Sequence, residues 1–178
     1  MTANDQKVLN IAHAVRDWCE QEVTRRTGYD FHNDPALSCM CAYASTVLMA
    51  CLAHFGVKNV SFAYGTQHAF LRVNRKILDI TATQFVTVEG QPSHRVEFAH
   101  ARSIRAKYKY PEYWATLHKY QNLDDVFDAL HPDSKTGFPK EQYWSSRKDM
   151  KNSVRSAIAF CMKRGISFER DEAWKLAA

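Results

Sequence analysis

Residue types that together perform nucleophilic catalysis occur in order between positions 37 and 81. Two cysteines, Cys39 and Cys41, lie in the stretch LSCMCAYAS, His68 begins the stretch HAFLRV, and Asp79 lies within KILDIT. A cysteine nucleophile needs a base that takes its proton and a third group that orients that base. It also gains from a helix N-terminus, which favours the thiolate. The order therefore predicts a Cys-His-Asp catalytic triad.

The two cysteines stand two positions apart at the expected start of a helix. Side chains at that spacing point about 200° apart, so at most one thiol can face His68. The face of Cys39 is mixed, whereas the face of Cys41 continues as a stripe of small and apolar residues. We therefore predict that Cys41 is the nucleophile at the third helical position, with Ser38 as the N-cap. The stripe comprises Ala44, Ser45, Leu48, Leu52 and Phe55.

The geometry of one hairpin decides whether His68 and Asp79 can meet. If Asn74 and Arg75 form a two-residue loop, His68 and Asp79 share a face as diagonal neighbours, with Cα atoms about 7–8 Å apart. A three-residue loop would put them on opposite faces. We expect the cysteine helix to pack on the face that carries His68, Phe70, Ile77 and Asp79. The opposite face would carry Ala69, Leu71, Val73, Leu78 and Ile80.

The elements needed to position these residues follow from hydrophobic spacing and turn residues. The pattern predicts a single domain over residues 1–178 with an α+β fold, a core at 37–90 and a C-terminal helical part at 111–178. The expected helices cover residues 5–27, 38–55, 123–130 and 139–165, and the expected antiparallel strands cover 59–64, 68–73 and 76–81, with a possible fourth at 85–90.

Three segments resemble the successive Cys, His and Asp segments of transglutaminase-like proteins within the papain-like cysteine superfamily. They read CAYASTVLMACLAHFGV, HAFLRV and ILDITATQF, and the resemblance covers residues 37–86. The chain lacks a Trp after the His and has Cys39 where a small residue is usual. The resemblance implies a cysteine-bearing helix packed on a small antiparallel sheet, flanked by N- and C-terminal helices. The matching residues are Cys41, Ala44, Ser45, Gly56, His68, Asp79 and Thr81.

The resemblance also implies chemistry through a thioester acyl-enzyme, as in a peptidase, a deamidase or a transglutaminase. Cys41 would attack the carbonyl, His68 would move the proton, and Asp79 would hold the imidazole tautomer. The backbone N–H of Cys41 would bind the oxyanion. The side-chain amides of Gln84 and Gln67 are candidates to help it, although surface glutamines would give the same pattern.

Other interpretations of the same residues remain open. A zinc site could draw on Cys39, Cys41, His54 and His68, but C-x-C is not the usual ligand spacing, and it is not the C-x-x-C of thioredoxin-like proteins. A catalytically inactive transglutaminase-like module is the other alternative. It would use the basic segment 94–114, especially 102–109, to contact an acidic partner.

Composition narrows the remaining choices. The chain has 178 residues, 46% of them hydrophobic, and a net charge of +5. We expect no secretory leader, no membrane span and no nucleic-acid motif. The odd number of cysteines, five, favours thiols in a reducing compartment, the cytoplasm. We expect no cofactor or metal, and a protein or peptide as substrate.

Overall fold

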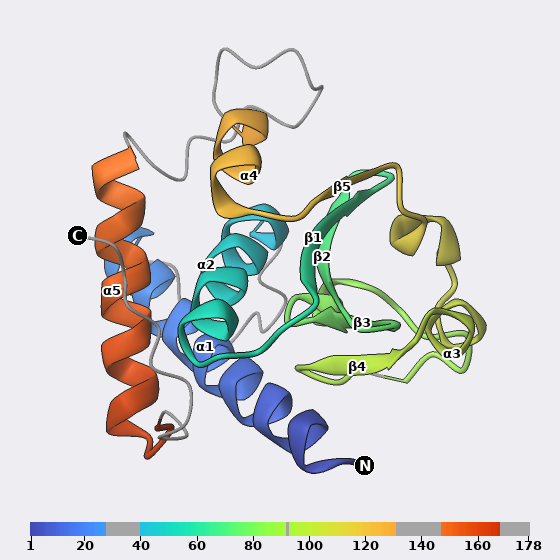
Figure 1. Ribbon diagram of the computed structural model, residues 1–178. Helices are drawn as coiled ribbons and strands as arrows, with labels where there is room; N and C mark the ends of the chain where they lie inside the picture. The colour runs from blue at the N-terminus through green and yellow to red at the C-terminus, as the bar shows by residue number, and fades with distance from the viewer. Residues whose placement is uncertain (28–39, 92, 131–146, 168–178) are drawn as a thin grey trace.

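The computed structural model describes residues 1–27, 40–91, 93–130 and 147–167 as an α+β arrangement (Figure 1). Gly28, Ser38, Cys39 and the first residues of the helix expected at 139–165 lie outside these ranges. The described helices are α1 (Ala3–Thr27), α2 (Cys41–His54), α3 (Ala101–Lys107), α4 (Leu123–Leu130) and α5 (Arg147–Lys163), with short 3₁₀ turns η1 (Ala82–Gln84) and η2 (Pro111–Trp114). The strands are β1 (Val60–Gly65), β2 (His68–Val73), β3 (Lys76–Asp79), β4 (Glu97–His100) and β5 (His118–Tyr120).

The strands form one antiparallel sheet in the order β4-β3-β2-β1-β5. Strands β2 and β3 are joined by the expected two-residue loop, because Val73 pairs with Lys76. Asn74 in that loop has a φ of 57°, the left-handed conformation that a tight hairpin turn needs and that Asn tolerates. The predicted register of this hairpin is confirmed.

The prediction of a possible fourth strand at residues 85–90 is wrong. That segment makes only an isolated bridge, between Thr87 and Tyr108, and the side chains of Val86 and Val88 are exposed. The fourth strand along the chain is instead β4, which lies within the basic segment and pairs with β3. β-branched residues alone suggested a strand at 85–90, but a strand also needs a partner along its length, and β3 takes β4.

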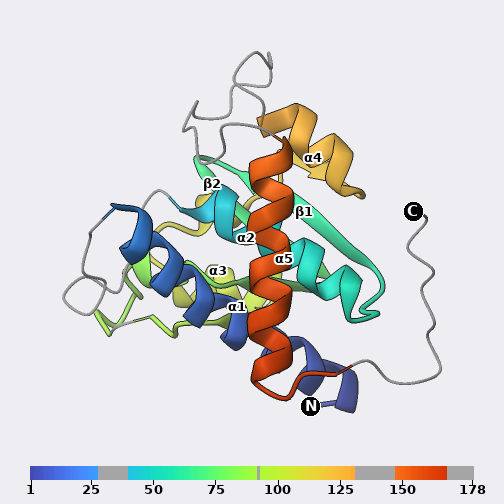
Figure 2. The same ribbon diagram turned by 90° about the vertical axis from the view of Figure 1, so that its left-hand side faces the viewer.

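The sheet separates two layers. Figure 1 shows α1, α2 and α5 on one side of it and α3 with η2 on the other. Helix α5 packs across both α1 and α2, as the turned view in Figure 2 shows. The apolar stripe of α1 is buried in this larger core, as its helical spacing predicts. Its members are Val8, Ile11, Ala12, Val15, Trp18 and Cys19.

The prediction that α2 packs on the sheet face carrying His68 and Asp79 is wrong. Helix α2 packs on the face formed by Ala69, Leu71, Val73, Leu78 and Ile80, which belong to one core with the α2 stripe. The opposite face, with Phe70 and Ile77, is covered by α3 and η2. The parity of the hairpin was predicted correctly. Helix α2 joins the larger core, which also contains α1 and α5, whereas the prediction assumed that the nucleophile and its base must share one face.

Gly65, at the end of β1, allows the chain before β5 to approach the sheet. A Cβ built on this residue would lie 2.2 Å from the carbonyl oxygen of Tyr113 and 2.8 Å from that of Ala115. Both atoms are backbone, so a side chain at this position requires η2 to move away.

No described helix is long and apolar enough to cross a membrane.

We expect Gly65→Ala to destabilise the protein by about 1–3 kcal/mol, the usual cost of overpacking a close contact. Urea unfolding followed by Trp fluorescence measures this change. Thr66→Ala is the matched control, because Thr66 is the exposed neighbour in the same hairpin. Equal free energies of unfolding for both variants would contradict the close packing of η2 on β1.

Candidate active site

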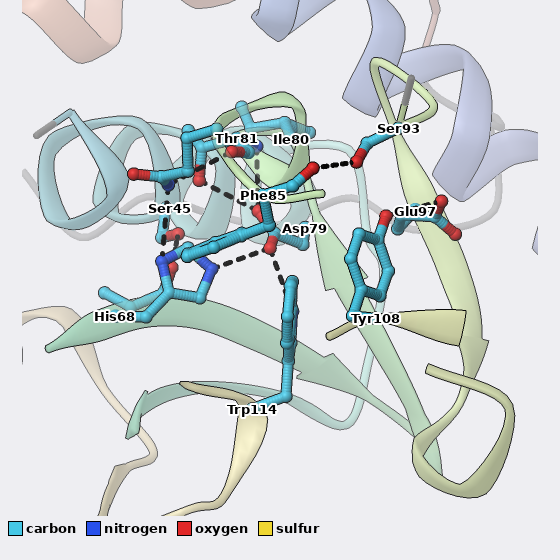
Figure 3. Close-up of polar contacts among 12 residues, drawn as sticks. Ser45, His68, Asp79, Ile80, Thr81, Phe85, Ser93, Glu97, Tyr108 and Trp114 are labelled. Atoms are coloured by element: carbon cyan, nitrogen blue, oxygen red, sulfur yellow. Dashed lines mark hydrogen bonds and ion pairs between the residues drawn. The ribbon is translucent and has the colours of Figure 1, made fainter. Parts of the chain in front are cut away.

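His68 and Asp79 form a buried pair, although they stand on different strands. His68 begins β2, Asp79 ends β3, and the imidazole Nε2 lies 2.7 Å from the Asp79 Oδ2 (Figure 3). Neither side chain is exposed to solvent. The pair therefore meets across the sheet as the hairpin register predicted.

The Asp79 carboxylate is held by further donors. The backbone N–H of Thr81 donates to Oδ1 over 2.7 Å and the hydroxyl of Thr81 over 2.9 Å, while Trp114 Nε1 donates to Oδ2 over 3.0 Å. Burial opposes ionisation of Asp79, but the charge and hydrogen bond of His68, together with the Thr81 bonds, hold its pKa below the usual value. The carboxylate is therefore kept ionised and fixed in orientation.

Helix α1 also secures this segment. The guanidinium of Arg16 is buried and donates through Nη1 to the carbonyl of Ile80, the residue between Asp79 and Thr81. The Nε of Arg16 binds Glu20 one turn further along the helix, over 2.8 Å. A buried arginine paired in this way fixes the backbone that presents the carboxylate.

His68 has two different neighbours on its two ring nitrogens. Burial opposes its protonation, but the charge and hydrogen bond of Asp79 and a hydrogen bond with Cys41 outweigh burial and raise the pKa to about 10. Because Asp79 takes Nε2, the nitrogen left for the Cys41 thiol is Nδ1. His68 thus links the predicted nucleophile to the predicted carboxylate.

Cys41 occupies the first position of α2, and not the third position expected from Ser38 as the N-cap. Met40 stands at the cap position and makes no side-chain capping bond. Ser38 and Cys39 lie outside the described residues, so the structure does not compare the two thiols. That Cys41 and not Cys39 is the nucleophile stays a prediction. Cys41 is partly buried and still lies in the first turn, where backbone N–H groups have no partner within the helix.

Small residues let α2 approach the sheet close to His68. Ser45, one turn after Cys41, donates its hydroxyl to the carbonyl of Ala69 over 3.2 Å, and Ala69 follows His68 in β2. Ala44 and Ser45 are both buried at this contact. The N-terminus of α2 consequently reaches the end of the sheet where β2 begins, so that Cys41 meets a histidine on the opposite face.

Gln84 lies beside the same ring nitrogen as Cys41. Its Nε2 is 3.5 Å from His68 Nδ1 and donates to the carbonyl of Thr81 over 3.0 Å. Turn η1, which follows β3 directly, brings the amide there. Gln67, the other candidate amide, is an exposed residue of the β1–β2 turn with a φ of 60°.

Two of the aromatic rings beside His68, those of Phe85 and Trp114, were not expected from the sequence, whereas Phe70 was expected on the same face. The ring centroids of Phe85 and Trp114 lie 4.7 and 5.4 Å from that of the imidazole, each edge to face (Figure 3). The ring centroid of Phe70 lies 6.0 Å from that of the imidazole. The indole of Trp114 comes from η2, far along the chain from the histidine. The sequence offered one signal for this contact, the Trp that follows Pro111. A buried tryptophan needs an acceptor for its indole N–H, and a buried carboxylate such as Asp79 can supply it.

The other described cysteines do not join the triad. Cys19, Cys51 and Cys161 are buried in the core formed with α1, α2 and α5. Burial raises the pKa of the Cys19 thiol well above its usual value. For Cys51, a hydrogen bond with Cys161 and burial both raise the pKa. Cys19 and Cys51 are therefore poor nucleophiles, and the hydrogen bond with Cys51, which lowers the pKa of Cys161, keeps the Cys161 thiol in the same core.

The zinc set considered from the sequence does not assemble as proposed. His54 ends α2 and Cys41 begins it, which separates them by about 20 Å of helix. Within the described ranges, no three His, Cys, Asp or Glu side chains gather as metal ligands. We assign no residues to a metal or a cofactor.

Part of the basic segment is neutralised within the fold. Arg95 pairs with Asp17 and Glu20 of α1, over 2.8 and 2.5 Å. Lys107 pairs with Glu97, which also accepts a bond from the Tyr108 hydroxyl. These pairs fix β4 and α3 to their neighbours, so two of the five Lys and Arg side chains in the segment act within the protein.

Comparison with protein-family models, with curated proteins and with solved structures finds no match for this chain. The chemistry of this chain is therefore inferred from the geometry of Cys41, His68, Asp79 and Gln84.

Proposed function

We propose that this protein is a cysteine-dependent amide-bond enzyme that acts through a thioester acyl-enzyme. The observation that carries the proposal is the placement of His68, which is bonded to Asp79 on one ring nitrogen and to Cys41 on the side of the other. A nucleophile, a base and an orienting carboxylate in that order form the minimum arrangement for this chemistry. The local resemblance to transglutaminase-like proteins supports the same reaction class.

Each residue would have one role in the reaction. The thiolate of Cys41 attacks the amide carbonyl, and His68 gives the Nδ1 proton to the departing amine. The developing oxyanion is bound by the backbone N–H of Cys41 and by the side-chain amide of Gln84. Water then attacks the thioester carbonyl, His68 takes a proton from it, and the C–S bond breaks to release the carboxylic acid and the Cys41 thiolate beside the protonated His68. Asp79 keeps the imidazole oriented throughout.

The proposal includes a reducing compartment such as the cytoplasm. The described cysteines are thiols, and three of them are packed in the core without a disulfide. The nucleophile itself must also stay reduced to react.

A peptide digest of a whole proteome, incubated with the wild type or with Cys41→Ala, tests the proposal. Mass spectrometry reads new chain termini and crosslinks, and a coupled assay reads released ammonia. We expect at least one product that depends on Cys41. If both proteins give identical digests, the alternative of an inactive module that binds an acidic partner replaces this proposal.

A further inference from the structure

A row of aromatic rings leads from the buried imidazole to the protein surface. The ring centroid of Phe85 lies 4.7 Å from that of His68, and Tyr113 stacks on Phe85 with the centroids 5.0 Å apart. The ring of Tyr110 follows, with its centroid 5.7 Å from that of Tyr113. Burial decreases along this row, because His68 is fully buried, Phe85 and Tyr113 are half-buried, and Tyr110 is 48% exposed. We call Phe85, Tyr113 and Tyr110 the aromatic row.

The aromatic row is held rigidly beside the site. The backbone of Tyr113 packs directly on Gly65, and Gly65 is the strand partner of His68. Trp114, the next residue, is fixed by its bond to Asp79. The backbone N–H of Tyr113 also donates to the carbonyl of Tyr110 over 3.2 Å. A fixed aromatic surface next to a catalytic base binds a substrate group with little loss of conformational entropy.

The position of the row indicates which part of a substrate it contacts. In the proposed reaction, the departing amine must lie beside His68 Nδ1 to receive its proton. Gln84 reaches that nitrogen, and Phe85 is the next residue in the chain. A group carried by the amine nitrogen is therefore adjacent to Phe85 and Tyr113.

We propose that the aromatic row binds the leaving group, and that this group is a peptide segment with an apolar or aromatic side chain directly after the scissile bond. The inference rests on the proposed function and narrows it to peptide-bond cleavage. A deamidase releases ammonia, which has no side chain for such a surface to contact. The three rings and their graded exposure match a side chain that enters from solvent.

The same surface selects an incoming amine when the step runs in reverse. The amine nitrogen attacks the thioester carbonyl, the C–N bond forms, and the C–S bond breaks. His68 takes the proton released by the amine, and Cys41 leaves as the thiolate. An added amine competes with water for the same acyl-enzyme. Because the acyl group is the same in every reaction, the ratio of the two products depends only on how well the amine binds on the leaving-group side.

The experiment uses p-nitrophenyl acetate as acyl donor, with phenylalanine amide or glycine amide as acceptor. The initial burst of p-nitrophenol counts acylated enzyme, and mass spectrometry gives the ratio of acetylated amine to acetate. We expect the ratio for phenylalanine amide to exceed that for glycine amide by about tenfold, the discrimination typical of one apolar contact. Tyr113→Ala and Tyr110→Ala should lower this preference, and Tyr113→Phe should keep it.

Controls separate the two proposals. Leu117→Ala removes an apolar side chain that is 60% exposed and outside the aromatic row, so it should leave the preference unchanged. Tyr110 is exposed, so its alanine variant tests the inference even if Tyr113→Ala fails to fold. A Cys41-dependent burst with equal ratios for both amines overturns the leaving-group inference and leaves the proposed function standing. A burst no larger than that of Cys41→Ala overturns both.

Discussion

Replacing Cys41 with alanine is expected to lower the rate of acyl-enzyme turnover by at least about 10⁴-fold, because a group that forms the covalent intermediate cannot be bypassed. The first position of α2 is only partly buried, so the fold should survive the change. The measurement is the rate of p-nitrophenyl acetate hydrolysis, with circular dichroism to confirm folding.

Cys51→Ala is the matched control, since it removes a buried thiol from the same helix. Its folded fraction should keep the rate of the wild type. Equal turnover by wild type and Cys41→Ala would mean that another residue carries the chemistry.

Asp79→Asn is expected to lower the same rate by about 10²–10⁴-fold, the range that a positioned acid-base group contributes. The substitution keeps the size of the side chain but removes the charge that stabilises the His68 imidazolium. In the wild type, burial opposes protonation and Asp79 outweighs it, so the pKa of His68 is about 10. The alkaline limb of the rate profile should therefore lie near pH 10 in the wild type and at lower pH in the variant.

Stability provides a second readout of Asp79→Asn. A raised pKa of His68 in the folded protein contributes stability that is complete below its unfolded pKa, about 6.5. That contribution is lost as pH rises from about 6.5 toward 10. The free energy of unfolding should thus fall over this window in the wild type and change less in the variant. Glu89→Gln, at an exposed carboxylate, should leave both profiles unchanged.

The hairpin and the relation of His68 to Asp79 could be predicted from sequence because both depend on local rules. Alternation along two strands fixes which side chains share a face, and Asn74 in a two-residue turn fixes the register. The stripe of α2 was likewise readable, since it requires only helical spacing. Thr81, noted for its match to the family pattern, binds the carboxylate of Asp79.

The remaining features depend on contacts between distant segments. Which face α2 covers depends on contacts with distant segments, since α1 and α5 join α2 in one core and α3 and η2 cover the other face. Trp114 reaches Asp79 only because β5 pairs with β1 and Gly65 admits the chain that precedes it. Strand β4 was not predicted, because charged residues surround it in the sequence. Its Glu97 is buried because it pairs with Lys107 and Tyr108.

The alkylation rate of Cys41 at pH 6 tests the central claim most directly. Iodoacetamide alkylates the thiolate and not the thiol, and an imidazolium next to a cysteine favours the thiolate. Iodoacetamide labelling, read by mass spectrometry at each cysteine, should modify Cys41 before Cys39 or any buried thiol. Its rate should exceed that of glutathione by about tenfold or more and fall in His68→Ala. Labelling of Cys41 no faster than glutathione, and unchanged in His68→Ala, would contradict an activated nucleophile in this protein.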